Sequence, residues 1–135
     1  MALKSTDQIH AHRRAMGPLA ARQLDARLEH VPTGDGAVVS VASLCASDDL
    51  ATAVAELRRR VPDGARLHFV EHVGRDRLVT RLAGRVYASL PMGCHVGHDV
   101  PAALRRGGFT VTDLERFSMP SANPLLRHWV SGVAQ

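Results

Sequence analysis

Two strand-like apolar runs on either side of an amphipathic helix set the architecture of this chain. Residues 37–44, AVVSVASL, are short, apolar and rich in β-branched side chains, which predicts a buried strand. Residues 65–73, ARLHFVEHV, predict a second strand. Between them a helix begins at residues 47–49, and its apolar residues repeat at helical spacing: Leu50, Ala53, Val54, Leu57 and Val61. A strand, a helix and a strand in this order predict a right-handed parallel βαβ unit.

An N-terminal helical segment, residues 1–32, precedes this unit. Residues 5–30 predict two helices, and the second begins at Pro18, where the first turn of a helix tolerates a proline. The turn PTGDG at residues 32–36 then leads into the first predicted strand. The rest of the chain, residues 33–135, predicts one α/β domain.

The elements after the βαβ unit complete the predicted sheet. Residues 75–90 predict a helix, and Asp99 is placed to cap a short helix that ends at residues 107–108, Gly-Gly. Residues 109–117 and the apolar segment at residues 126–134 predict two further strands. We therefore expect about four strands with helices on both faces, a three-layer α/β fold.

Composition excludes several classes of protein. No stretch of the 135 residues is long and apolar enough for a transmembrane helix, and the first residues are polar, so we expect no membrane and no signal peptide. Two cysteines, Cys45 and Cys94, indicate free thiols in a reducing cytoplasm. The net charge of +4 is carried by dispersed arginines, and only 4% of residues are aromatic, so we expect no nucleic-acid partner.

The order of these motifs resembles the C-terminal half of class I S-adenosylmethionine-dependent methyltransferases, of the type-11 and ubiquinone-biosynthesis kind. The family pattern of helix, turn and strand stands here as AELRR at residues 55–59, PDG at 62–64 and LHFVEH at 67–72. Residues 93–120, GCHVGHDVPAALRRGGFTVTDLERFSMP, and the ending RHWVSGVA resemble the later part of the same family. The resemblance implies a partial Rossmann-like sheet in the family's strand order fourth, fifth, seventh, sixth, with the last strand antiparallel.

The resemblance also implies a cofactor site that this sequence does not complete. The family holds S-adenosylmethionine with a glycine-rich loop after its first strand, and that strand should lie before residue 37. The segment there predicts helices, and its G-x-G, Gly34-Asp35-Gly36, precedes a strand instead of following one. We therefore expect this chain alone to hold S-adenosylmethionine poorly.

The resemblance assigns site residues to the carboxyl ends of the strands, where ligands bind in open α/β sheets. Leu44, Cys45 and Ala46 would border the cofactor. His72 would be a general base oriented by Glu71. The substrate face would be covered by a loop carrying Cys94, His95 and His98.

Each of these residues also has a structural interpretation, which we favour. His72 can hydrogen-bond a neighbouring loop, Glu71 can satisfy loop amides, and Cys45 can be a small buried thiol. The donors of the 94–99 cluster lack the paired spacing of a structural zinc site, and Asp99 already serves as a helix cap. We expect no metal.

Three functions remain open. The first is a truncated methyltransferase relative that binds or acts on a small molecule but cannot methylate alone. The second is a repurposed pocket that binds or rearranges a small apolar ligand without methyl transfer. The third is a non-catalytic interaction domain. The strand at residues 37–44 has no charge or proline to protect its edge, so we expect a homodimer through this strand or through the N-terminal helices.

Overall fold

The computed structural model describes residues 2–3, 13–14, 16–31, 37–45, 47–73, 98–121 and 127–135. Its helices and strands, in chain order, are β1 (Ala2–Leu3), α2 (Pro18–Glu29), β2 (Ala37–Val41), α3 (Leu50–Arg60), β3 (Arg66–His72), α5 (Val100–Arg106), β4 (Val111–Ser118) and β5 (His128–Ala134). The predicted helix at residues 75–90 and most of the first predicted N-terminal helix lie outside the described residues. None of the described helices is long and apolar enough to cross a membrane.

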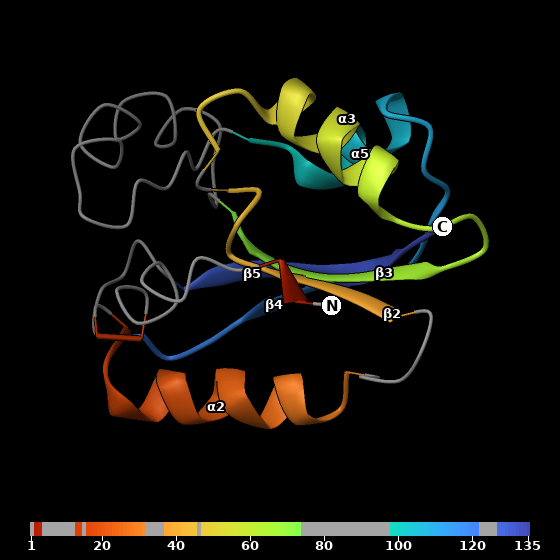
Figure 1. The fold of residues 1–135 in the computed structure, drawn as a ribbon. Coiled ribbons are helices and arrows are strands. Elements are labelled where there is room, and N and C mark those ends of the chain that lie inside the picture. Colours follow the sequence, from red (N-terminus) through yellow and green to blue (C-terminus); the bar gives the residue numbers. More distant parts are fainter. Residues whose placement is uncertain are drawn as a thin grey trace.

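A five-stranded mixed sheet forms the middle of the molecule, in the order β1-β2-β3-β5-β4. β1, β2 and β3 are parallel, and β5 runs antiparallel between β3 and β4. Helices α3 and α5 cover one face of the sheet and α2 covers the other (Figure 1). The predicted three-layer α/β fold and the order of its last four strands are confirmed.

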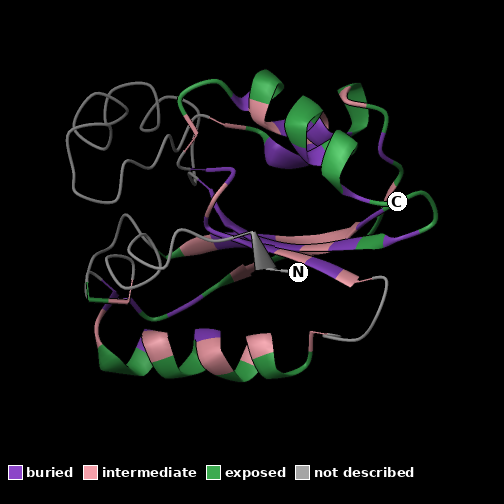
Figure 2. Ribbon diagram, in the orientation of Figure 1, coloured by how far each residue is buried: buried purple, intermediate pink, exposed green. Residues whose placement is uncertain are grey.

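Two separate apolar clusters fill the spaces between the layers. The larger joins α3 and α5 to the sheet through residues such as Val54, Leu104 and Phe69. The second joins α2 to the other face through residues such as Leu24 and Trp129. Figure 2 shows buried residues on the inner sides of the helices and exposed residues on their outer sides. This two-sided burial explains why the parallel strands read as nearly continuous apolar runs.

The ends of the helices follow the predicted caps. The Asp49 carboxylate accepts the Thr52 N–H at 3.1 Å at the start of α3, and Asp99 accepts the Ala102 N–H at 3.1 Å at the start of α5. β2 is shorter than predicted and ends at Val41. The next residue, Ala42, adopts a positive φ of 49°, which does not continue a strand. That turn carries the backbone away from the sheet toward α3.

The N-terminal segment departs from the prediction of helices alone. Ala2–Leu3 forms β1, which pairs in parallel with Val39 and Ser40 of β2. The expectation that the segment before residue 37 forms helices and no strand is therefore wrong, and β2 has a short partner strand at its outer edge. Because α2 and α3 lie on opposite faces, the β1-to-β2 and β2-to-β3 crossovers have opposite hands. One of the two crossovers is therefore left-handed, which is rare for connections between parallel strands.

The homodimer stays a prediction. β1 pairs with only two of the five residues of β2, so a second chain still has a strand edge to extend. Light scattering at micromolar concentration should give the mass of two chains. A mass of one chain for the wild type would contradict the dimer.

Candidate functional site

Glu71, near the carboxyl end of β3, is fully buried and fixes the loop that follows β2. Its carboxylate accepts the Ser40 hydroxyl at 2.8 Å and the backbone N–H groups of Leu44 and Cys45 at 3.4 and 3.1 Å. The Ser40 hydroxyl lies 2.7 Å from that of Ser43. Glu71 thus satisfies loop amides, which is the structural interpretation of this residue.

Burial raises the pKa of the Glu71 carboxyl above its ordinary value, because desolvation disfavours the charged form. The hydrogen bonds from Cys45, Ser40 and Leu44 act in the opposite direction and offset part of this effect. A carboxyl with this balance holds its proton to higher pH than an exposed glutamate does.

His72 is also fully buried, and its ring centroid lies 5.5 Å from that of Trp129. Successive side chains of a strand point to opposite faces of a sheet. Glu71 is bonded to Ser40 and the loop before α3, whereas His72 packs beside Trp129 of the cluster under α2. Glu71 is therefore placed to hold the loop after β2, not to orient the His72 ring.

The residues assigned to the cofactor side lie at the loop that Glu71 holds. Leu44 and Cys45 are buried, and Ala46 lies outside the described residues. Both described amides donate to Glu71, so they are already used within the protein. Cys45 is in no disulfide, and its side chain is buried within the apolar cluster under α2.

Of the predicted substrate-side loop, His98 alone falls within the described residues; Cys94 and His95 lie outside them. The His98 Nε2 lies 2.7 Å from the carbonyl oxygen of Ser47, to which it donates. This bond ties the segment before α5 to the segment before α3. Among the described residues, no three His, Cys, Asp or Glu side chains are grouped closely enough to hold a metal ion.

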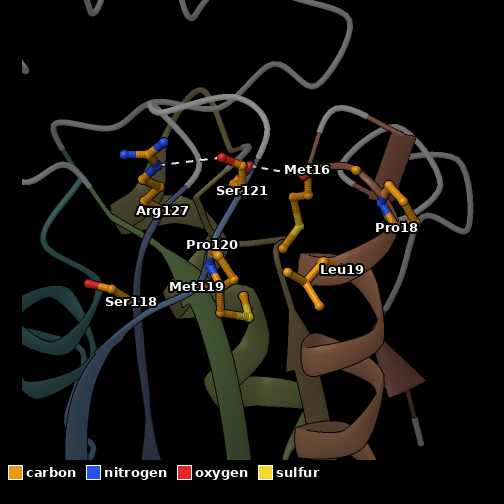
Figure 3. Close-up of a pocket in the computed structure, with 9 residues that line it drawn as sticks. Met16, Pro18, Leu19, Ser118, Met119, Pro120, Ser121 and Arg127 are labelled. Carbon is orange, nitrogen blue, oxygen red and sulfur yellow. Dashed lines mark hydrogen bonds between the residues drawn. The ribbon is translucent and has the colours of Figure 1, made fainter.

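A pocket of about 590 Å³ opens at the carboxyl edge of the sheet, on the α2 side. It is lined by residues 16–19 at the start of α2, residues 118–121 after β4, and residue 127 before β5. Figure 3 shows the Met16, Leu19 and Met119 side chains gathered across this space. Met16 and Met119 are almost completely buried and lie beneath its surface, whereas Leu19 is 52% exposed.

Polar contacts hold the two walls of the pocket together. The Ser121 hydroxyl donates to the Met16 carbonyl at 3.3 Å, and the Arg127 Nε donates to the Ser121 carbonyl at 3.4 Å. Sequence reasoning misses this site, because residues 119–124, MPSANP, are typical of a turn-rich connection only. The signal was present, because Met119 and Pro120 follow a predicted strand at the same edge as Glu71.

No family model and no curated protein matches this chain. A solved structure of a putative methyltransferase, BH2331 from Bacillus halodurans C-125, matches with a TM-score of 0.50 at 14% identity, covering 84% of this chain and 74% of that chain. The fold resembles that of Rossmann-like methyltransferases. This likeness concerns the fold alone, and the residues of the site are argued from their own geometry.

Two further methyltransferase structures overlap the chain in part. Methyltransferase CalO6 has a TM-score of 0.49 at 21% identity, covering 78% of this chain and 36% of that chain. The arsenic(III) S-adenosylmethionine methyltransferase CrArsM from Chlamydomonas reinhardtii has a TM-score of 0.45 at 19% identity, covering 87% of this chain and 41% of that chain. The chain thus spans less than half the length of these two proteins.

The described carboxyl edge does not fit S-adenosylmethionine in the way that the family resemblance implies. The Leu44 and Cys45 amides are bonded to Glu71, and the Cys45 side chain is buried. The residues that follow β1 in the sequence, residues 4–12, contain no glycine with which the backbone could approach a cofactor closely. The described edge also carries the pocket lined by residues 16–19, 118–121 and 127.

Proposed function

We propose that this chain is a methyltransferase-like protein that binds a small molecule at the carboxyl edge of its sheet and does not transfer a methyl group by itself. The supporting observation is the position of β1. It lies beside β2, where the family's first strand would lie, yet the residues that follow it, KSTDQIHAH, carry no glycine-rich loop. In the family such a loop supplies close backbone contacts to S-adenosylmethionine, so in this proposal the chain holds the cofactor poorly.

The pocket favours small-molecule binding over a purely structural interaction domain. Its volume of about 590 Å³ lies within the range of small-molecule sites, and it opens at the edge where α/β folds bind ligands. Its lining is mostly apolar, with hydroxyl, carbonyl and guanidinium groups at one side. In this proposal Glu71 and His72 stabilise the end of the sheet and do not react with the ligand.

Isothermal titration calorimetry with S-adenosylmethionine and S-adenosylhomocysteine tests the methyl-transfer half of the proposal. We expect no saturable heat from either compound at concentrations up to about 1 mM. A dissociation constant of that size corresponds to only about 4 kcal/mol of binding free energy. Circular dichroism on the same sample should confirm that the chain is folded. A one-to-one titration in the micromolar range would show that the lone chain holds the cofactor and would overturn the proposal.

A further inference from the structure

We propose that the ends of α3 and α5 form a binding surface for a short acidic segment of a partner protein. β3 and β4 each begin at this edge of the sheet, directly after the two helices, so the surface lies at the edge opposite the pocket. The arginine surface consists of five residues in the last turns of α3 and α5: Arg58, Arg59, Arg60, Arg105 and Arg106. None of them lines the pocket, so this inference is independent of the proposed function.

Packing between α3 and α5 brings the two groups of arginines together. A Cβ atom added to Gly107, which directly follows Arg106, would lie 2.3 Å from the Val54 side chain of α3. One turn further along α3, the Arg58 guanidinium lies 5.0 Å from the centre of the Phe109 ring. Figure 1 shows the end of α3 and the turn after α5 on the same side of the molecule. The two groups therefore make one continuous surface.

The arginine surface concentrates the positive charge of the chain. All of its arginines are exposed. The acidic side chains that follow or precede them closely in the sequence are Glu56, which lies 4.0 Å from Arg59, and Asp63 in the turn after α3. Counting side chains only, five positive charges against these two negative ones leave three of the net four that the whole chain carries. The C-terminal ends of the two helices offset only about half a charge each, so most of this charge is available to a partner.

The small extent of the surface favours a short acidic segment over a nucleic acid. The opposite ends of the same helices carry exposed carboxylates: Asp48, Asp49 and Asp99. α3 has 11 residues and is therefore about 16 Å long, so a duplex lying along the helices would bring its phosphates to these carboxylates. Phe109, the ring beside the arginines, is only 3% exposed, so a base cannot stack on it.

Guanidinium groups and the absence of an apolar anchor favour a protein segment over a membrane. A guanidinium donates two parallel hydrogen bonds to a carboxylate, and an arginine that lies over a ring keeps the N–H groups at its edge free to do so. Within the described part of the chain, the large exposed apolar side chains are Leu19 on α2 and Leu114 on β4. Neither lies on α3 or α5, so the arginine surface carries no such side chain to insert between lipids.

Fluorescence anisotropy of fluorescein-labelled octaglutamate with the full chain tests this proposal. We expect saturable binding at about 50 mM salt that weakens at least about fivefold at about 200 mM, because salt screens exposed charges. Arg59→Gln combined with Arg106→Gln should weaken binding about five- to tenfold, since it removes two of the guanidinium groups. The matched control is Arg22→Gln combined with Arg116→Gln, which removes the same charge from exposed arginines of α2 and β4. The control pair should change the affinity less than about twofold.

Three results would overturn the proposal. The first is no binding of octaglutamate at the lower salt concentration, and the second is equal weakening by the two pairs of substitutions. The third is tighter binding of a short DNA duplex, or of vesicles that contain phosphatidylserine, with the same loss on changing Arg59 and Arg106. That result would assign the arginine surface to a nucleic acid or to a lipid surface instead of an acidic protein segment.

Discussion

Glu71→Ala is expected to lower the free energy of unfolding by about 3 to 5 kcal/mol, close to the largest effects that single substitutions produce. The change leaves the N–H groups of Leu44 and Cys45 without their acceptor inside the protein. The Ser40 hydroxyl loses the same partner, although Ser43 lies close enough to replace it. Urea denaturation followed by circular dichroism measures the loss.

Glu71→Gln is the matched control for this prediction. Its carbonyl oxygen can accept the Cys45 N–H while its amide group donates to the Ser40 hydroxyl, so the side chain keeps two of its contacts. We expect this variant to lose about 1 to 2 kcal/mol. If Glu71→Gln lowers the free energy of unfolding as much as Glu71→Ala does, the charge of Glu71 and not its hydrogen bonds stabilises the loop.

The same residue gives the fold a dependence on pH. Burial raises the pKa of Glu71, so the folded protein keeps its proton at a pH at which the unfolded chain has released it. The unfolded state then binds fewer protons, and the free energy of unfolding falls as the pH rises through the range above the ordinary pKa of a glutamate. Glu71→Gln should flatten this slope at pH values above the ordinary pKa of a glutamate. An equal slope in both proteins would assign the dependence to other groups.

The fold was predictable because its main elements are local patterns. The run at residues 37–44, the helical spacing from Leu50 to Val61 and the strand ending at His72 are each set by neighbours in the sequence. The family resemblance added the order of the strands. β1 was not predictable, because a segment of two residues is too short to show the alternating pattern of a strand. Its pairing with Val39 and Ser40 depends on the three-dimensional course of the chain.

The candidate site was predictable only in part, for a related reason. Glu71 and the loop at Leu44 and Cys45 were found because they lie at the carboxyl ends of the two predicted strands, 37–44 and 65–73. The pocket joins segments that are distant in the sequence: the hydrogen bond from Ser121 to Met16 spans 105 residues. No sequence pattern links positions so far apart. They lie side by side because α2 packs against the sheet.

Trp129 is the residue on which that packing depends most, and Trp129→Ala should cost about 3 to 5 kcal/mol. Its side chain is completely buried, lies between His72 on β3 and Phe117 on β4, and belongs to the cluster that contains Met16 and Leu24. The cavity left by an indole can close only if α2 moves toward the sheet. Thermal unfolding followed by circular dichroism measures the loss, because Trp129 is the sole tryptophan and cannot report on its own removal.

Two controls separate the size of the indole from its position. Trp129→Phe keeps a ring against His72 and should cost less than half as much as alanine. Leu114→Ala removes an exposed side chain of β4 and should stay within about 0.5 kcal/mol of the wild type. Since α2 supplies one wall of the pocket, Trp129→Ala should also speed hydrogen exchange in α2 more than in α3, which packs on the opposite face. Equal acceleration in both helices would mean that the two apolar clusters unfold as one unit.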